Sequence, residues 1–196
     1  MYDIPCILFA GGRSSRMGEN KALLPFANAQ SLTQYQYERL KELFEKVYIG
    51  TKKPELFNHI DAFFIDESEH PDVFAPTVGF VSAFKQLKEE SHLLVLSVDA
   101  PFVNNEIFDA LAEFKESDYD AIIVRTASGT HPMCGLYSRS LEATLQKMLK
   151  EDNHKLGQML KNAKVHYIDI EDEELLTNVN TQDEYQKALK ILKGEK

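Results

Sequence analysis

The sequence predicts an α/β protein in three layers, with a mostly parallel sheet and helices packed on both of its faces. Two observations carry this prediction. Short apolar runs recur along the chain and are continuous rather than alternating, which is typical of strands buried on both faces of a parallel sheet. Segments with apolar residues at helical spacing lie between these runs, and strands that alternate with helices are typical of this fold class.

Six apolar runs are the predicted strands, and in chain order they are 4–10, 46–50, 62–66, 93–99, 120–124 and 165–170. The stretch 128–140 predicts a further strand or hairpin, with antiparallel pairing as one option, and 151–164 predicts a short helix. In sheets of this kind, ligands bind outside the carboxyl ends of the strands. Gly11, Asp66 and Asp99 each fall at or just past such an end, so they are the first candidates for a binding site.

The longer helices carry start signals. Ser31 and Gln34 form a capping-box pattern, and so do Thr181 and Glu184 near the C-terminus, while Asn104 is suited to cap a third helix. In each case the apolar residues that follow are predicted to lie on one helical face. These residues are Leu40, Leu43, Phe44 and Val47; then Ile107, Phe108, Leu111 and Phe114; then Tyr185, Ala188, Leu189 and Leu192.

The length and the composition of the chain limit the classes of function that it can have. The 196 residues contain 43% hydrophobic and 27% charged residues, and no repeat or linker divides them, so one domain is expected over residues 1–196. The formal net charge of −9 argues against a broad nucleic-acid or anionic-membrane interface, although a small anionic ligand sees only the local field. No signal peptide or membrane span is expected, and Cys6 and Cys134 are expected to be buried thiols, so the expected location is cytoplasmic.

The segment 8–26, LFAGGRSSRMGENKALLPF, follows the first predicted strand and joins glycines to positive charge. Gly11 and Gly12 allow close approach of the backbone to a ligand, and successive amides can form an anion cup. The segment also contains three cationic side chains that can contact phosphate: Arg13, Arg16 and Lys21. A Walker loop is excluded because Glu19 follows Gly18, and G-x-G-x-x-G is excluded because the first two glycines are adjacent. From glycines and charges alone, a polyphosphate site and a solvated basic loop are equally consistent interpretations.

Asp99 ends a buried strand, where an ionised carboxylate must be solvated, paired or bound to a cation. Mg²⁺ typically binds through one or two carboxylates together with substrate phosphates and waters. Taken alone, Asp99 is equally consistent with a metal ligand and with a helix cap, although Asn104 is better placed as the cap. Other candidates have ordinary structural roles when taken alone: Asp66 fits a strand-end turn, His131 a structural side chain and Asn180 a helix cap.

The loop resembles the signature L-A-G-G-x-S-x-R-M-G-x-x-K-x-L-L-x-F of the nucleotidyltransferases with a Rossmann-like fold. The matching positions are Phe9 (where Leu is usual), Ala10, Gly11, Gly12, Ser14, Arg16, Met17, Gly18, Lys21, Leu23, Leu24 and Phe26. The resemblance implies that the backbone of residues 9–11 contacts a nucleotide, with Gly12 in the same binding segment. It also implies that Arg16 and Lys21 hold phosphates, and that Asp99, in a D-x-P motif, binds the metal.

Three further segments resemble the molybdenum cofactor guanylyltransferases in particular. They are FAPTVG (74–79), HP (131–132) and NVNTQDEY (178–185). Departures from that family's pattern occur at Phe74, Ala75, Gln182 and, about where an Asn is usual, Gly50. The resemblance implies that some residues lie near the guanine, namely Asp66 and Gly79. It places others on the acceptor or metal side, namely His131, Asn178 and Asn180.

The resemblance implies an Mg²⁺-dependent transfer of GMP from GTP to molybdenum-bound molybdopterin, with Lys21, Arg16 and Asp99 as the catalytic residues. The attacking phosphate is already anionic, so no general base is expected, and positioning and charge neutralisation carry the chemistry. Proteins that mature molybdoenzymes are candidate partners. Two alternatives stay open: another small-molecule nucleotidyltransferase of this fold, such as a molybdopterin cytidylyltransferase or an enzyme making sugar nucleotides, and a non-catalytic GTP-binding module.

Overall fold

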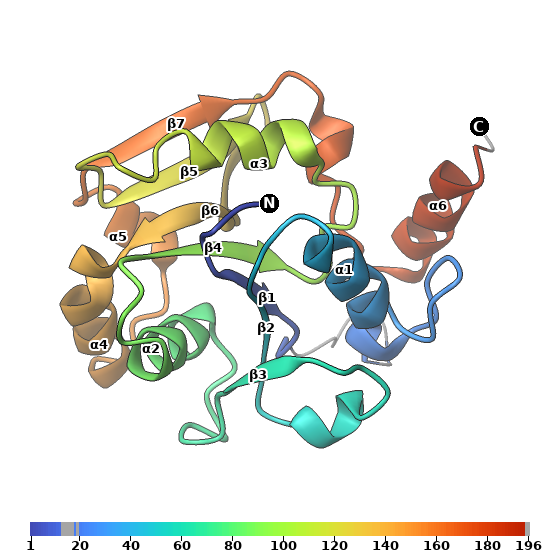
Figure 1. Ribbon diagram of the computed structural model, residues 1–196, viewed down its shortest axis with the longest axis horizontal. Helices are drawn as coiled ribbons and strands as arrows, with labels where there is room; N and C mark the ends of the chain where they lie inside the picture. Colours follow the sequence, from blue (N-terminus) through green and yellow to red (C-terminus); the bar gives the residue numbers. More distant parts are fainter. Residues whose placement is uncertain (13–17, 19, 195–196) are drawn as a thin grey trace.

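The structure, a computed structural model, describes residues 1–12, 18 and 20–194 (Figure 1). Within this part of the chain, seven strands form one sheet in the order β3-β2-β1-β4-β6-β5-β7. The strands are β1 (Cys6–Phe9), β2 (Val47–Thr51), β3 (Phe63–Asp66), β4 (His92–Ser97), β5 (Ala121–Thr126), β6 (Gly129–Ser138) and β7 (Val165–Asp169). Of the predicted candidates, Arg16 lies outside the described residues, as does its neighbour Arg13.

The sheet is mostly parallel, as the continuous apolar runs predict. Among the strands of the described residues only β6 is antiparallel, and it pairs with both β4 and β5, so the optional strand in 128–140 exists with the antiparallel pairing. The strands β1 to β3 progress toward one edge of the sheet, and β4 then returns to the other side of β1. This reversal opens a crevice at the carboxyl ends of β1 and β4, where ligands bind in open α/β sheets.

Six α-helices cover the two faces of the sheet among the described residues (Figure 1). They are α1 (Leu32–Lys41), α2 (Pro76–Gln86), α3 (Asn105–Ala112), α4 (Glu142–Lys150), α5 (Leu156–Leu160) and α6 (Gln182–Leu192), with short 3₁₀ turns η1 (Lys21–Leu23), η2 (Pro54–Phe57), η3 (Arg139–Leu141) and η4 (Glu173–Leu176). One core packs α1, α3 and α6 against the sheet, and a second core packs α2, α4 and α5 against the opposite face. The three-layer prediction is confirmed. No described helix combines the length and apolar character needed to cross a bilayer.

The alternation along β1 shows how a continuous apolar run serves both cores. Cys6 and Leu8 belong to the core under α1, while Ile7 and Phe9 belong to the core under α2, and all four side chains are buried. A strand that is covered by helices on both faces has no solvent-facing side, so its residues are apolar in both directions. The apolar run therefore predicts both the strand and its central place in the sheet.

The capped helices begin where the sequence predicts. The Thr181 hydroxyl and the Glu184 carboxylate form a reciprocal capping box at α6, and the Asn104 side chain accepts from the amide of Ile107 at 3.3 Å to start α3. At α1 the Ser31 hydroxyl accepts from an amide as expected, but the side chain of Gln34 accepts from the amide before Ser31. The box at α1 is therefore displaced by one residue.

The predicted extent of the first helix was wrong. The helix α1 ends at Lys41, and Val47 is the first residue of β2. The amides of Leu43 and Phe44 both donate to the Leu40 carbonyl, which closes a tight turn instead of a further helical turn. The Phe44 side chain stays buried because its ring packs edge-on against Phe108. Helical spacing of apolar residues does not distinguish a helix end from a turn that packs on the same core.

The helices α2 and α4 begin without a capping side chain, although α2 has a proline at its first position. The helix α2 begins at Pro76 after Ala75, which offers no capping side chain, and it contains Gly79 in its first turns. The helix α4 continues directly from the turn η3, and its N-cap residue, Leu141, makes no side-chain cap. Glycine lowers helix propensity, and a missing cap leaves amides without partners. Packing on the second core, through Phe80, Phe84 and Leu145, stabilises these helices instead.

Candidate active site

Three predicted side chains from distant parts of the chain meet at the crevice between β1 and β4. The Lys21 ammonium forms an ion pair with Asp99 Oδ2 and donates to Asn180 Oδ1 at 2.8 Å. Lys21 follows β1, Asp99 follows β4, and Asn180 lies just before α6. We call these three residues the charged cluster.

Backbone hydrogen bonds fix the segments that carry the charged cluster. The amide of Val98 donates to the carbonyl of Phe9 at 3.0 Å, and the amide of Val179 donates to the carbonyl of Asp99 at 2.7 Å. The Glu184 carboxylate accepts from the amides of Asn180 and Thr181, both at 2.8 Å. The capping box of α6 therefore positions Asn180 as well as starting the helix.

Asp99 has an oxygen that the described residues leave unsatisfied. Its side chain is only 12% exposed, Oδ2 faces Lys21, and buried Oδ1 has no hydrogen-bond partner within the described part of the chain. A buried carboxylate oxygen without a partner is costly unless a cation or donor binds it. No group of three or more His, Cys, Asp or Glu among the described residues is arranged to hold a metal. A cation bound by one carboxylate and substrate oxygens fits this donor set, as Mg²⁺ does.

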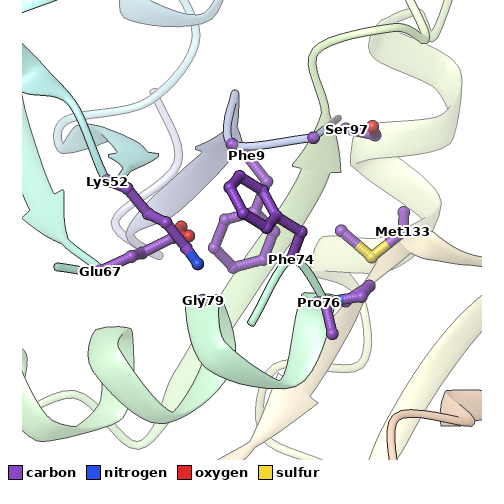
Figure 2. Close-up of a pocket in the computed structure, with 11 residues that line it drawn as sticks. Phe9, Lys52, Glu67, Phe74, Pro76, Gly79, Ser97 and Met133 are labelled. Carbon is purple, nitrogen blue, oxygen red and sulfur yellow. The ribbon is translucent and has the colours of Figure 1, made fainter. Parts of the chain in front are cut away.

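A second feature of the crevice is an apolar cavity of about 160 Å³ beside the loop that follows β1 (Figure 2). Its lining residues are Phe9, Gly11, Gly12, Lys52, Glu67, Phe74, Ala75, Pro76, Gly79, Ser97 and Met133. Figure 2 shows Lys52 and Glu67 on one side of the cavity and Ser97 and Met133 on the other. We call this the base cavity, because its apolar walls and single buried carboxyl suit a flat heterocycle.

Two glycines make room for the ring that forms the floor of the base cavity. A Cβ at Gly50 would lie 2.5 Å from Cδ1 of Phe9, and a Cβ at Gly79 would lie 2.5 Å from Cε1 of the same ring. Phe9 pairs directly with Gly50 across β1 and β2, and its ring packs edge-on against Phe80. Two departures from the family pattern are therefore connected: the glycine at position 50, about where an Asn is usual, makes room for the aromatic ring of Phe9, where a Leu is usual.

Glu67 supplies the carboxyl of the base cavity. The residue is 5% exposed, and burial raises the pKa of its carboxyl to about 7, an increase that nearby Lys52 opposes and Asp66 supports. The carboxylate of Asp66 is exposed and accepts from the amide of Ser68 at 2.8 Å, the strand-end turn described above as its alternative role. The residue aimed at the cavity is therefore the next one along the chain, which the sequence analysis missed.

Lys52 fixes the loop over the base cavity. Its ammonium donates to the carbonyls of His70 at 2.5 Å, Pro71 at 3.1 Å and Val73, and it lies 4.1 Å from the centre of the Phe74 ring. These hydrogen bonds connect the loop between β3 and α2 to the residue that follows β2. Lys52 carries no signal in the sequence, because three carbonyl acceptors from one loop exist only after the loop has folded.

A second hollow, of about 210 Å³, adjoins the charged cluster. It is lined by Ser97, Asp99, Ala100, Thr130, His131, Pro132, Met133, Cys134, Leu176 and Asn178. Since Ser97 and Met133 line this hollow and the base cavity, the two are neighbours. His131 Nε2 lies 3.0 Å from the Thr126 hydroxyl, and burial lowers the pKa of His131, which favours the neutral ring. We call this the acceptor hollow.

The family model of the MobA-like NTP transferase domain matches residues 6–167. The chain belongs to this family. The curated molybdenum cofactor guanylyltransferase of Campylobacter jejuni subsp. jejuni serotype O:6 is 34% identical over 187 residues, which cover 95% of this chain and 96% of that protein. The protein of the same name from Helicobacter pylori strain G27 is 36% identical, with 97% of this chain and 94% of that protein covered.

The fold agrees with this membership in the MobA-like family. The crystal structure of molybdopterin-guanine dinucleotide biosynthesis protein A from Archaeoglobus fulgidus superposes with a TM-score of 0.84. The superposition covers 97% of this chain and 100% of that chain, at 19% identity. The similarity at that identity concerns the fold, which is the Rossmann-like fold predicted from the loop signature.

The site of this MobA-like chain gathers most of the residues that the sequence singles out. The base cavity is lined by Phe9, Gly11, Gly12 and Gly79, and the acceptor hollow by Asp99, His131 and Asn178. Ala10 is buried beside them, and its amide donates to the carbonyl of Gly50 at 2.9 Å. Asp66 is not among the lining residues of either hollow, and Arg16 lies outside the described residues.

Proposed function

We propose that this nucleotidyltransferase transfers GMP from GTP to the terminal phosphate of molybdenum-bound molybdopterin and releases pyrophosphate. The observation that carries the proposal is the position of Asp99, which belongs to the charged cluster and lines the acceptor hollow next to the base cavity. A nucleotide with its base in the cavity would point its phosphates toward Lys21. Support for guanine and molybdopterin comes from the names of the curated relatives.

The residues of the charged cluster suit transfer between two anions. Lys21 can exchange its ion pair with Asp99 for phosphate oxygens and offset the charge that develops on the leaving pyrophosphate. Asp99 Oδ1, with the amide oxygen of Asn180 nearby, would hold Mg²⁺. That ion would supply charge neutralisation and alignment across the phosphates. Arg16 is proposed as a second phosphate ligand from its place in the loop signature.

Glu67 gives the base cavity a preference for guanine. Guanine presents two adjacent N–H donors, on N1 and on the 2-amino group, and an ionised carboxylate can accept both. Cytosine presents one amino donor beside an acceptor nitrogen, so it can satisfy only one oxygen of the ionised carboxylate. GTP is therefore the proposed donor when Glu67 is charged.

The second candidate is transfer of CMP from CTP to the same acceptor. A protonated carboxyl can donate to N3 of cytosine and accept from its amino group. The observation that favours this candidate is the pKa of about 7 for Glu67, which leaves the neutral form well populated near neutral pH. Both candidates use the charged cluster in the same way.

The deciding experiment incubates the purified protein with Mg²⁺, molybdate-loaded molybdopterin and each nucleoside triphosphate in separate reactions. Pyrophosphate release and the dinucleotide product are both measured. We expect product with GTP above pH 7. Product with CTP alone would replace guanylyl by cytidylyl transfer, and nucleotide binding without pyrophosphate release would make the chain a non-catalytic binding module.

A further inference from the structure

One buried face of helix α1 is polar, although an apolar face would be expected against the sheet. Thr33 and Gln36 are completely buried, and Arg39 is half-buried on the same side. Their spacing of three residues aligns the side chains along one face of the helix. We call these three residues the α1 polar row. Burial of such groups is unfavourable unless each is hydrogen-bonded, so their partners explain their presence.

The first member of the row contacts the segment that holds Lys21. The Thr33 hydroxyl donates to the carbonyl of Ala22, the residue after Lys21, at 2.8 Å. The amide of Leu32, at the start of the same helix, donates to the carbonyl of Leu24 at 2.7 Å. Two hydrogen bonds therefore connect the start of α1 to the turn η1 and the residue after it.

The second member of the row contacts the segment that holds Asp99. The side-chain amide nitrogen of Gln36 donates to the carbonyls of Val98 at 3.4 Å and of Ala100 at 2.9 Å. These carbonyls belong to the two residues that flank Asp99, so one amide group holds the backbone on both sides of the carboxylate. A hydrophobic residue in place of Gln36 would leave both buried carbonyls without this donor.

The third member completes the connection. One nitrogen of the Arg39 guanidinium donates to Gln36 Oε1 at 2.6 Å, and another donates to the carbonyl of Val103, just before α3. Arg39 therefore fixes the rotamer of Gln36 and the far end of the loop that carries Asp99. Burial lowers the pKa of Arg39, and its Nε has no hydrogen-bond partner within the described residues, so the energetic cost of this arrangement is substantial.

We infer that the α1 polar row is a positioning device that sets the relative placement of Lys21 and Asp99 for catalysis. The row touches neither reacting atom, so Thr33, Gln36 and Arg39 are positioning residues rather than catalytic ones. The inference rests on the proposed function, in which Asp99 holds Mg²⁺ and Lys21 holds phosphate. A displacement of about 1 Å in such a pair commonly costs about 10²-fold in rate, so accurate placement can offset the energetic cost of burying these polar groups.

The test compares a variant that removes only the hydrogen-bond donors of the Gln36 side chain with a variant that also removes its acceptor oxygen. Gln36→Glu keeps an oxygen for Arg39 but removes both donors to the loop, and Gln36→Met removes every polar contact at similar volume. The control is Arg139→Met, because Arg139 donates to the carbonyls of Phe84, Leu87 and Glu90 near the other end of the sheet. This control also loses buried main-chain contacts, but none of them leads to the charged cluster.

Two quantities are measured for each variant: the binding of Mn²⁺ in the presence of a GTP analogue that cannot be cleaved between its α- and β-phosphates, followed by electron paramagnetic resonance, and the Mg²⁺ concentration for half-maximal pyrophosphate release. We expect both Gln36 variants to weaken metal binding by about 10- to 100-fold, the range found for residues that orient metal ligands. Arg139→Met should lower Tm with unchanged metal dependence. Thr33→Val should raise the KM for GTP instead, because it acts on the segment of Lys21.

Each possible result supports or contradicts the inference. The inference is overturned if Gln36→Glu binds Mn²⁺ and responds to Mg²⁺ as the parent protein does. It is also overturned if Arg139→Met loses as much metal affinity as the Gln36 variants do. If the Gln36 variants fail to fold, the near-isosteric Thr33→Val decides the matter, and an unchanged KM for GTP contradicts the inference. If the parent protein releases no pyrophosphate from any nucleotide, the proposed function fails, while the Mn²⁺ comparison still tests the positioning role.

Discussion

The charged cluster and the base cavity lie side by side but are built by opposite means. Lys21, Asp99 and Asn180 are ionic and polar groups held by hydrogen bonds from α1 and from the cap of α6. The base cavity is a packed apolar space, shaped by the Phe9 ring against glycines, with the carboxyl of Glu67 at one side. Under the proposed function, the cluster would control the rate of transfer and the cavity would control which nucleotide is used.

Loss of the Asp99 charge gives the largest expected effect. In Asp99→Asn, the side chain keeps its size but loses the charge that pairs with Lys21 and would hold Mg²⁺. We expect guanylyl transfer to fall by about 10³-fold, the upper end for loss of one electrostatic contact in a transition state. Measurement of pyrophosphate release across a range of Mg²⁺ concentrations checks this expectation. A variant with the parent rate and Mg²⁺ response would make Asp99 a purely structural residue.

Removal of the Lys21 ammonium ranks second. In Lys21→Ala we expect the rate of transfer to fall by about 10²-fold, because one charge-assisted phosphate contact is lost. Buried Asp99 then lacks its cation, so Tm should fall in the absence of metal and recover when Mg²⁺ is added. Calorimetry with and without Mg²⁺ separates this effect from global damage. Full activity in the GTP-dependent assay would contradict the phosphate role.

The two regions also differ in how far the sequence predicts them. Lys21, Asp99 and Asn180 were singled out because they stand at motif positions of the family that the sequence resembles, after a strand or before a helix cap. Glu67 was missed, since an acidic pair at a strand end offers two carboxylates and only the fold decides which one faces inward. In the same way, the α1 polar row looks like an ordinary amphipathic surface until the carbonyls it contacts are in place.

Substitution of Glu67 tests the selectivity of the base cavity. In Glu67→Gln the side chain keeps its shape, but one acceptor oxygen becomes an NH₂ donor, so the two adjacent N–H donors of guanine no longer face two acceptor oxygens. We expect kcat/KM for GTP to fall by about tenfold, as when one charged hydrogen bond is lost, while Mg²⁺ dependence stays the same. The matched control is Asp66→Asn, on the neighbouring exposed carboxylate. A larger loss in the control than in Glu67→Gln would assign base selection to Asp66.

The raised pKa of Glu67 adds a pH dependence with a definite sign. Because burial raises this pKa from 4.5 to about 7, the folded protein binds the proton more tightly than the unfolded chain between these values. The free energy of unfolding should therefore fall as pH rises through this range, by about 3 kcal/mol from this group. Glu67→Gln should remove this dependence in urea unfolding at pH 4.5 and 8. In the same window, affinity for GTP should rise more steeply with pH in the parent protein than in Glu67→Gln, because the terminal phosphate of GTP ionises in both experiments whereas Glu67 ionises in the parent protein alone.

The smallest expected effect on activity concerns the floor of the base cavity. In Gly50→Ala the new methyl group would overlap the Phe9 ring, and overpacking of this kind costs about 1–3 kcal/mol of stability. The KM for GTP should rise only as far as the ring is displaced, with little change in kcat. Phe9→Leu removes the ring carbons in question, so the double variant should recover most of the lost stability. Additive losses in urea unfolding would show that the ring is not the limiting neighbour, and would leave Glu67 Oε1, 2.8 Å from the position of the new Cβ, as the group that Gly50 accommodates.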